Sequence, residues 1–307
     1  MTEVSWAGIS WAETSWLWAV FTLIAAAAQT VRNATQRELT TTLGTVGATH
    51  VRFLFGFPFA VVILLGVLVI GGLRLPSPDG VYWLWVLGGA AAQVAATGLM
   101  LAAMNDRSFV VVYAYIKTEP VQAAIFGLMF LDDVVTLPAA VAIVVATTGV
   151  VIMALKPGAQ LGLRASLLGL ASGAMFALSS VSFRGGILSL GESSFLMAAT
   201  FTMVAGLTLQ AGWLSLYLLV RDRAVLAAIG RAWRSSLLAG FLGALATQFW
   251  FLAFALATAA SVRTLALVEV LFAQAISTFV FRQATTRREA LGIVLIVAGV
   301  AALVWTH

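Results

Sequence analysis

The sequence contains no cysteine and only two histidines, His50 and His307. The absence of cysteine excludes disulfides, thiolate metal sites and thiol nucleophiles. Two histidines are too few for a metal site built from histidine, so we expect neither a metal nor another cofactor. Charge is scarce as well: Asp, Glu, Lys and Arg make up 9% of the 307 residues, compared with about 25% in ordinary soluble proteins. This composition argues against a soluble domain.

Hydrophobic residues make up 62% of the chain. They form long runs in which apolar and polar residues do not alternate. Lipid cannot form hydrogen bonds with the backbone, so a segment that crosses a membrane is either a helix or part of a closed barrel. Barrel strands alternate between apolar and polar residues over about 10 positions. The sequence therefore predicts an all-α integral membrane protein.

A helix needs about 20 apolar residues to cross a bilayer. Ten stretches meet this condition, and the short links between them carry proline, glycine or charged residues. Residues 1–15 carry two Glu and no Lys or Arg, whereas a signal peptide begins with basic residues, so we expect no cleaved signal peptide. The ten predicted transmembrane helices span residues 15–36, 46–71, 81–104, 108–131, 135–155, 164–188, 194–220, 235–257, 259–281 and 288–306.

Two glutamates, Glu119 and Glu269, each lie near the middle of a long apolar run, 150 residues apart. At the same offset Gly149 matches Gly299, together with several apolar residues. Apolar matches arise easily by chance in this composition, but a matched Glu and a matched Gly do not. We therefore predict two repeats of five helices. Because five is odd, the second repeat is inverted, which is typical of alternating-access carriers. The predicted repeats span residues 1–156 and 157–307.

The distribution of basic residues predicts the orientation in the membrane. Lys and Arg collect in cytoplasmic loops. Most of the basic residues between spans lie in the links after the odd-numbered spans, whereas the other side holds only Arg74 and Arg184. We therefore predict that both termini lie outside the cytoplasm and that the link 156–164 lies inside. The net charge of +5 reflects this topology, and we expect no nucleic-acid partner.

The fourth and fifth spans of each half share a pattern that resembles a known family. One segment runs from Glu119-Pro120-Val121 to Met153 and the other from Glu269-Val270-Leu271 to Val304. Each consists of a helix, a short charged turn and a final helix that contains a glycine. In these features the chain resembles the paired EamA domains of the drug/metabolite transporter superfamily, and Arg52 looks like an arginine common in that family.

The resemblance covers the whole chain. It implies a secondary carrier in a bacterial-type inner (plasma) membrane that moves small metabolites, often outward. Two features depart from the family pattern. The family often has a proline after the glutamate position in both halves, whereas this chain has Pro120 in one half and Val270 in the other. Several relatives are thought to keep both termini in the cytoplasm, opposite to the orientation that the basic residues predict here.

Glu119 and Glu269 are the first candidates for a transport site. A charged group inside a membrane costs about 3 kcal/mol on insertion scales. Burial disfavours the charged form of a carboxylate, so each residue could carry a proton; each could equally be the counter-charge of a substrate ammonium group. The alternative is a structural ion pair with Lys117 or Arg263. Lys117 and Glu119 are two positions apart, so they would not face each other on one helix.

Other polar residues in the predicted spans are candidates for the lining of a pocket. On continuous helices, Tyr115 and Gln122 share a face with Glu119, and Arg263 shares a face with Gln274. Arg263 could recognise a carboxylate or extend from the helix end towards water. Amides inside membranes often join helices instead, at about 0.6 kcal/mol each. The remaining candidates are Gln29, Asn33, Gln93, Gln248 and Trp250, with Pro120 as a residue that could kink the fourth span.

The sequence favours a secondary carrier of small metabolites that works by alternating access through a central cavity at mid-membrane. Amino-acid export is the leading interpretation, because acid, base, amide and aromatic groups together suit a zwitterion with variable side chains. A carrier of drugs or organic cations is the alternative, and a channel or scaffold is less favoured. The usual hydrolase, metalloprotease and nucleotide-binding motifs are absent, so we expect no enzyme activity. The expected partners are a small-molecule substrate, lipid, and protons as a candidate coupling ion, with the chain a monomer or homodimer.

Overall fold

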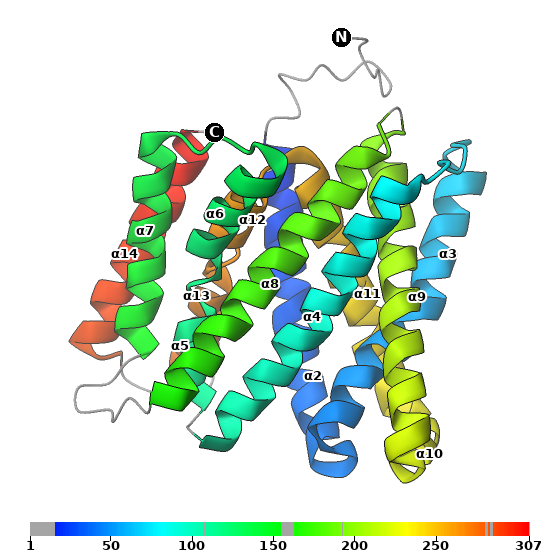
Figure 1. The fold of residues 1–307 in the computed structure, drawn as a ribbon. Helices are drawn as coiled ribbons and strands as arrows, with labels where there is room; N and C mark the ends of the chain where they lie inside the picture. The colour runs from blue at the N-terminus through cyan, green and yellow to red at the C-terminus, as the bar shows by residue number, and fades with distance from the viewer. Residues whose placement is uncertain are drawn as a thin grey trace. The chain divides into compact units, whose positions relative to one another are not determined.

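The computed structural model describes residues 16–106, 109–154, 163–191, 193–279, 282 and 285–306. These residues form helices joined by turns, with no strand among them (Figure 1). The prediction of an all-helical chain is therefore confirmed for this part. The first 15 residues, which led us to expect no signal peptide, lie outside the described part. The helices are α2 (Leu17–Leu54), α3 (Gly56–Val69), α4 (Gly80–Asp106), α5 (Phe109–Ile116), α6 (Glu119–Leu131), α7 (Leu137–Ala154), α8 (Leu163–Ser189), α9 (Phe195–Arg221), α10 (Arg223–Arg231), α11 (Trp233–Leu256), α12 (Ala259–Leu265), α13 (Val268–Phe279) and α14 (Arg287–Trp305).

Seven helical segments in the described part are long and apolar enough to cross a membrane. They coincide with seven of the ten predicted stretches, so the chain has the character of a helical membrane protein. The prediction of ten spans stays a prediction. The seven segments are Leu43–Val69, Gly80–Met104, Leu137–Ala154, Leu163–Ser189, Phe195–Arg221, Trp233–Leu256 and Arg287–Trp305.

The other three predicted stretches are not single regular helices ending at the expected residues. The stretch 108–131 is divided into α5 and α6, and the stretch 259–281 is divided into α12 and α13. Our assumption of one continuous helix in each was therefore wrong. The first stretch belongs to α2, which runs on to Leu54 but bends at Gly44, where the backbone adopts φ 66°. Positive φ is readily accessible to glycine because it has no Cβ.

The chain forms two compact units, which we call unit 1 and unit 2. Unit 1 combines Met1–Ala90 with Phe183–Leu256, and unit 2 combines Ala91–Ser182 with Ala257–His307. Each unit therefore contains segments from both halves of the sequence. The division into repeats at 1–156 and 157–307 concerns sequence similarity rather than compactness, and it stays a prediction.

In unit 2, α7 and α14 lie side by side and run in opposite directions (Figure 1). Glycines allow their close approach. A Cβ on Gly149 would lie 2.7 Å from the carbonyl oxygen of Gly292, and one on Gly299 would lie 2.6 Å from the amide nitrogen of Ala146. Small residues at such crossings let membrane helices pack backbone against backbone. The matched glycines of the sequence therefore pack one helix against its counterpart from the other half.

A second correspondence lies in the turns before these two helices. Asp132 follows α6 with φ 54°, and Arg282 follows α13 with φ 52°. The two residues are 150 positions apart, which is the offset between Glu119 and Glu269. Residues other than glycine rarely adopt positive φ. Unit 2 therefore carries a left-handed residue at two positions that the predicted repeat makes equivalent, and the repeat itself stays a prediction.

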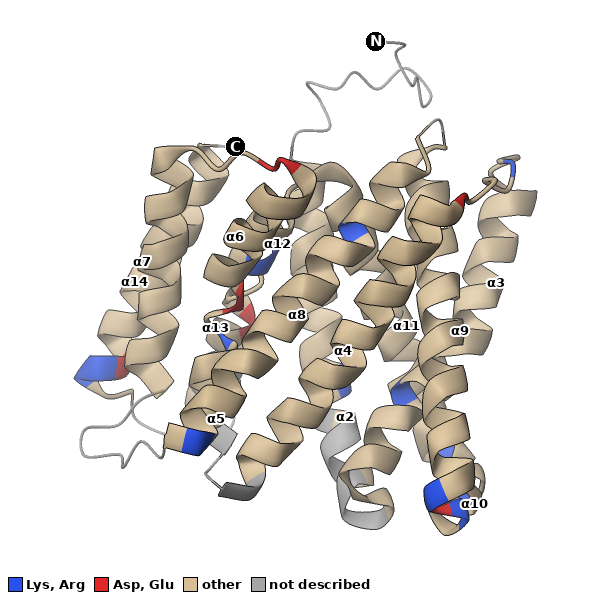
Figure 2. Cartoon of the chain, in the orientation of Figure 1, with Lys and Arg blue, Asp and Glu red and all other residues tan. Residues whose placement is uncertain are grey.

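Most charged residues lie near helix ends and links, as Figure 2 shows. The short helix α10, which we did not predict, carries basic residues at both ends. A group of both signs also lies along α6, α12 and α13, within the predicted apolar stretches. Glu119 and Glu269, the two glutamates singled out in the sequence, lie in the first turns of α6 and α13.

Candidate functional site

The site is built around the two helix interruptions of unit 2. Between α5 and α6, the backbone N–H of Thr118 donates to the carbonyl of Tyr115 (3.2 Å). Between α12 and α13, the N–H of Leu267 donates to the carbonyl of Thr264 (3.0 Å). These bonds span three residues instead of four, so each break is a tight turn of the 3₁₀ type. Such turns within a helical segment often mark hinges.

Pro120 explains the first interruption but not the second. Proline has no backbone N–H, so a continuous helix would lose the bond from residue 120 to the carbonyl of Ile116. It is instead the second residue of α6, within the first helical turn where proline is tolerated. The helix is interrupted next to Pro120, where we expected a kink; a role of this residue in gating stays a prediction. The equivalent residue in the other half is Val270, so the second break arises without proline.

Glu269 is buried at the start of α13 and pairs with a cation from the other broken helix. Its side chain is 5% exposed. Its carboxylate forms an ion pair with Lys117 and accepts a hydrogen bond from the hydroxyl of Tyr113 (2.9 Å). The Lys117 ammonium also lies 4.9 Å from the centre of the Tyr113 ring, where the ring face attracts a cation. The carboxylate of Glu269 is therefore stabilised by the ammonium group of Lys117 and the hydroxyl of Tyr113, both from the other broken helix.

Glu119 makes the reciprocal contact. It is 8% exposed, and its Oε1 lies 2.9 Å from Nε of Arg263 on α12. The same Nε donates to the hydroxyl of Ser180 on α8 (2.8 Å), and this hydroxyl lies 3.3 Å from Glu119 Oε1. The Ser180 hydroxyl also lies 2.9 Å from the carbonyl oxygen of Phe176. Because it has one proton, it can donate to only one of these acceptors at a time.

The two ion pairs are crossed between the broken helices. Glu119 follows the first break and pairs with Arg263, which precedes the second break. Glu269 follows the second break and pairs with Lys117, which lies in the first break. The acids lie in the first turns of α6 and α13, where the positive end of the helix dipole stabilises negative charge. Pairing offsets much of the cost of burying four charges, although it does not make them a net source of stability.

The predicted polar face of Tyr115 and Gln122 packs against α8. A Cβ added to Gly169 would lie 2.9 Å from Cβ of Tyr115, and one added to Gly173 would lie 3.1 Å from Oε1 of Gln122. The Gln122 side-chain amide donates to the carbonyl of Leu170 (3.4 Å). Gln122 could line a pocket or join two helices, and the observed contacts are those of a residue that joins helices. Its buried Oε1 has no hydrogen-bond partner.

Two further predicted contacts lie in unit 1. Trp250 donates its indole N–H to the side-chain oxygen of Gln29 (3.2 Å), which links α11 to α2. Gln248, 5% exposed, donates to the hydroxyl of Thr200 (2.9 Å), which links α11 to α9. Both pairs therefore have the geometry of contacts that join helices.

The last three candidates are Asn33, Gln93 and Gln274. Asn33 accepts a hydrogen bond from Nη2 of Arg32 (2.8 Å), and Gln274 donates to the hydroxyl of Thr285 (3.5 Å). Gln93 is half-buried in α4. The candidates thus divide between the compact units, and their convergence on one cavity stays a prediction. Unit 2 contains Gln93, Tyr115, Glu119, Gln122, Arg263, Glu269 and Gln274, and unit 1 contains Gln29, Asn33, Gln248 and Trp250.

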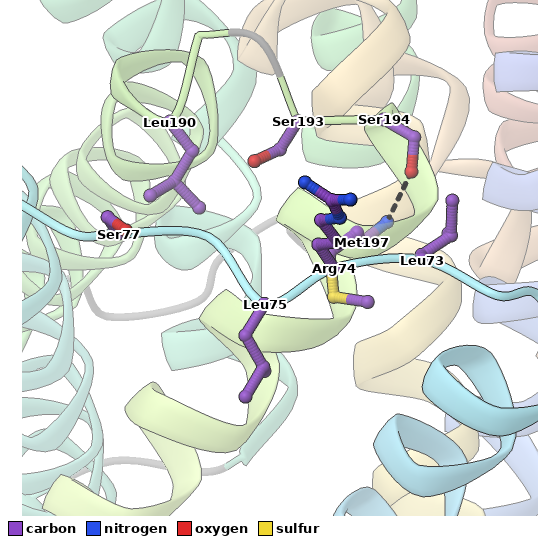
Figure 3. A pocket seen from close by; sticks show the side chains of 8 residues that line it. All are labelled: Leu73, Arg74, Leu75, Ser77, Leu190, Ser193, Ser194 and Met197. Atoms are coloured by element: carbon purple, nitrogen blue, oxygen red, sulfur yellow. Dashed lines mark hydrogen bonds between the residues drawn. The ribbon is translucent and has the colours of Figure 1, made fainter.

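A pocket of about 510 Å³ lies in unit 1, between the link that follows α3 and the link that precedes α9 (Figure 3). Arg74 and three serines provide its polar groups, and Ser194 caps α9 by accepting from the N–H of Met197 (3.2 Å). None of the predicted site residues lines it. The pocket is lined by Leu73, Arg74, Leu75, Ser77, Leu190, Ser193, Ser194 and Met197.

Three residues that we did not place in the site contact the two glutamates, and we call them together with Glu119, Glu269 and Arg263 the charge cluster. They are Lys117, Tyr113 and Ser180. We considered Lys117 only as a partner of Glu119, two residues away, and dismissed that pair by helical geometry. Its actual partner is Glu269 of the other half. The signal available in the sequence was the repeat itself. Each half has a cation near its acid, so the cation of one half could pair with the acid of the other half.

Comparison with known proteins establishes the fold and no more. No protein-family model matches the chain, and no curated protein matches it in sequence. Among solved structures, 29 chains match, so the fold recurs. One is a crystal structure that superposes with a TM-score of 0.69 at 15% sequence identity, covering 94% of this chain and 99% of the other. At this identity the likeness shows a shared fold over nearly the full length of both chains.

Proposed function

We propose that the protein is a secondary carrier of small metabolites, with amino acids as its substrate class. The observation that carries this proposal is the pair of crossed ion pairs at two helix interruptions. Discontinuous membrane helices are a recurrent feature of carrier binding sites, where helix ends and unwound backbone meet the substrate. Ionisable groups inside membrane segments usually serve transport, because their burial is costly.

The charge balance of the cluster favours a zwitterion. Lys117 and Arg263 oppose Glu119 and Glu269, so the four charges sum to zero. An amino acid is also neutral overall, and it can exchange its ammonium and carboxylate groups for internal partners without adding net charge to a medium of low dielectric. An organic cation would add one positive charge, and this addition is costly inside a membrane. We therefore favour amino acids over drugs or organic cations.

The mechanism follows from the same exchange. When a substrate ammonium group binds Glu119, Arg263 becomes available to the substrate carboxylate, for which its guanidinium fork is well suited. The ion pair between Glu119 and Arg263 is thereby replaced by interactions with the substrate, and the 3₁₀ turns act as hinges. Protonation of either carboxylate would release its cation in the same way, which makes the proton the candidate coupling ion.

Flux measurements test this function. Purified protein in proteoliposomes is expected to move at least one member of a labelled amino-acid panel faster than empty vesicles do. Glu119→Gln is expected to lower this flux about tenfold or more, because it removes a charge that the substrate uses. Gln93→Ala, an uncharged polar position in the same unit, serves as the matched control and is expected to change it much less. Movement of organic cations alone, or equal wild-type flux in both variants, would contradict the proposal.

We also propose that the membrane is the inner (plasma) membrane of a bacterial-type cell, with both termini outside the cytoplasm. The absence of cysteine allows single cysteines to be placed without background. In intact cells, an impermeant maleimide is expected to label Ser77→Cys, in the link after α3, and to label Gln160→Cys only after permeabilisation. We expect this labelling pattern because the link 156–164 is bounded by the basic residues Lys156 and Arg164, and basic residues collect in cytoplasmic loops. The opposite labelling pattern would place the termini in the cytoplasm.

A further inference from the structure

A second group of positive charge lies in unit 1, outside the crossed ion pairs. Arg32 and Arg52 both belong to α2, on either side of the bend at Gly44. A Cβ added to Gly243 of α11 would lie 3.1 Å from Cγ of Arg52 and 3.6 Å from Cδ of Arg32. The bend in α2 thus brings two arginines that are 20 positions apart in the sequence against the same glycine.

These two guanidinium groups lie where positive charge is costly. Arg32 is 6% exposed, and Nη2 of Arg52 is buried without a hydrogen-bond partner. Arg32 and Arg52 both carry a positive charge, and like charges repel each other. Such repulsion grows as the surrounding dielectric constant falls. A buried guanidinium donor without an acceptor indicates a missing anionic or polar partner.

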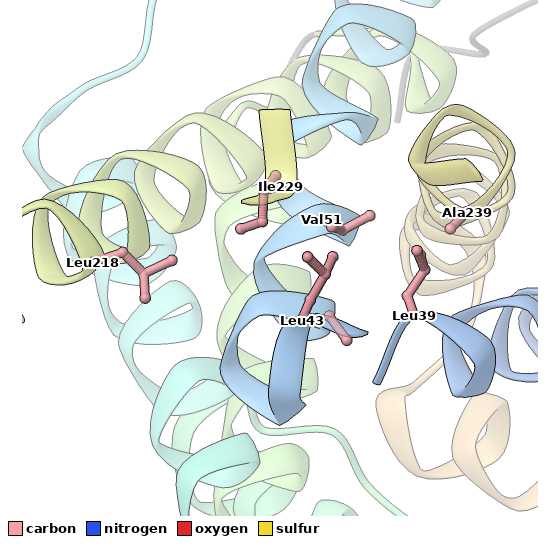
Figure 4. Close-up of a cluster of buried hydrophobic side chains, with 7 residues drawn as sticks. Leu39, Leu43, Val51, Leu218, Ile229 and Ala239 are labelled. Atoms are coloured by element: carbon pink, nitrogen blue, oxygen red, sulfur yellow. The ribbon is translucent and has the colours of Figure 1, made fainter. Parts of the chain in front are cut away.

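The surroundings are apolar. Val51, the neighbour of Arg52, belongs to a buried cluster with side chains from α2, α9, α10 and α11 (Figure 4). The cluster lies close to the arginines along the chain, since Ala239 of α11 belongs to it and is one turn from Gly243. The cluster consists of Leu39, Leu43, Ala48, Val51, Leu218, Ile229 and Ala239.

The acidic side chains that the structure describes in unit 1 serve other purposes. Asp79 accepts a hydrogen bond from the N–H of Tyr82 at the start of α4 (2.8 Å). Asp222 caps α10 by accepting from the N–H of Val225 (3.2 Å). Each is engaged at a helix N-terminus, where a carboxylate is favourably placed. The described part of the unit therefore offers Arg52 a repelling cation and a cation–π contact with Phe53, at 4.3 Å from the ring centre.

We propose that Arg32 and Arg52 form a buried binding site for an oxyanion, a carboxylate or phosphate group. The stems of the two arginines pass the same small residue, and guanidinium groups form paired hydrogen bonds with planar carboxylates and with phosphates. The bound anion would neutralise the repulsion between the arginines. This site is independent of the carrier proposed above, because it is defined by binding and lies in the other compact unit.

Thermal unfolding of the purified protein in neutral detergent tests the site. Inorganic phosphate is expected to raise the melting temperature relative to chloride at equal ionic strength, because a ligand that binds only the folded state stabilises it. Arg52→Gln is expected to abolish this rise. Arg74→Gln removes the same charge from an exposed position of the same unit and is expected to preserve it. A rise of equal size in Arg52→Gln, or no response to any anion probe, would overturn the proposal.

A second arm identifies the source of the anion. Micelles that contain phosphatidylglycerol are compared with micelles that contain phosphatidylcholine. A response to phosphatidylglycerol without a response to free phosphate assigns the site to a lipid headgroup, and the reverse assigns it to a soluble anion. Both responses must disappear in Arg52→Gln, or the binding lies elsewhere.

Two variants keep the test decisive if Arg52→Gln does not fold. Arg52→Lys retains the charge but loses the guanidinium fork, so phosphate affinity is expected to fall about tenfold. Arg52→Met removes one of two repelling charges while filling much of the same volume. Without phosphate, it is expected to melt at or above the wild-type temperature. A sharp fall in the melting temperature of Arg52→Met would show that Arg52 has a structural partner within the chain, and this result would overturn the proposal.

Discussion

Glu269→Gln is expected to lower the free energy of unfolding by about 3–5 kcal/mol, because it removes the carboxylate that forms an ion pair with the buried Lys117. Lys117 is 8% exposed and Glu269 is 5% exposed, so water cannot replace the lost carboxylate. The hydroxyl of Tyr113, which donates to Glu269 in the wild type, could accept from the ammonium group instead but carries no negative charge. Denaturant titration in detergent micelles measures the loss.

The double variant Lys117→Met/Glu269→Met distinguishes the effect of removing the whole ion pair from the effect of leaving one charge unpaired. Replacing a whole buried ion pair by apolar side chains of similar volume is often neutral or stabilising. We therefore expect the double variant to recover most of the stability lost in the single variant. Arg74→Gln, which neutralises an exposed charge, is the control and should change stability by less than about 0.5 kcal/mol. A loss in Glu269→Gln no larger than in this control would show that the ion pair is not formed in the folded protein.

Gly299→Val is expected to destabilise the protein by about 2–3 kcal/mol through the contact between α14 and α7. A Cβ at residue 299 would stand 2.6 Å from the amide nitrogen of Ala146 and 2.7 Å from the carbonyl oxygen of Ala142. Both are backbone atoms, so no side-chain rotation can relieve the overlap. The two helices must separate, and they lose the close packing on which membrane helix association depends. Thermal unfolding in detergent gives the size of the effect.

Gly66→Val is the matched control, since Gly66 is also a helical glycine in a predicted membrane span but has no atom within 4 Å of the added Cβ. The same substitution there should change stability by less than about 0.5 kcal/mol. Equal effects at the two positions would mean that α7 and α14 do not pack through Gly299.

The sequence predicted the helical membrane character and the two acids at the centre of the charge cluster. The reason is physical: apolar runs of about 20 residues have few other stable forms, and an acid inside such a run is conspicuous because it is costly. Gly149 and Gly299 were also visible, because glycine is less readily matched by chance than Ala, Val, Leu or Ile. Their role in the packing of α7 against α14 required the structure.

The breaks and the crossed pairing could not be derived from helical periodicity. Periodicity assumes one continuous helix, and it placed Lys117 and Glu119 on opposite faces without revealing Glu269 as the partner of Lys117. Pro120 indicated one break, whereas the second break has Val270 at the equivalent position and carries no such signal. Pairing between residues about 150 positions apart depends on tertiary packing. For the same reason, hydropathy gave no indication that Arg32 and Arg52 meet at Gly243.

The central claim is that the crossed ion pairs take part in transport and do not serve only to join two helices. Flux of the labelled amino-acid panel through Lys117→Met/Glu269→Met in proteoliposomes tests it most directly, because this variant is expected to fold. We predict flux about tenfold or more below that of the wild type, despite a similar free energy of unfolding. Wild-type flux in the folded double variant would contradict the claim and would leave the pair a structural link between the broken helices.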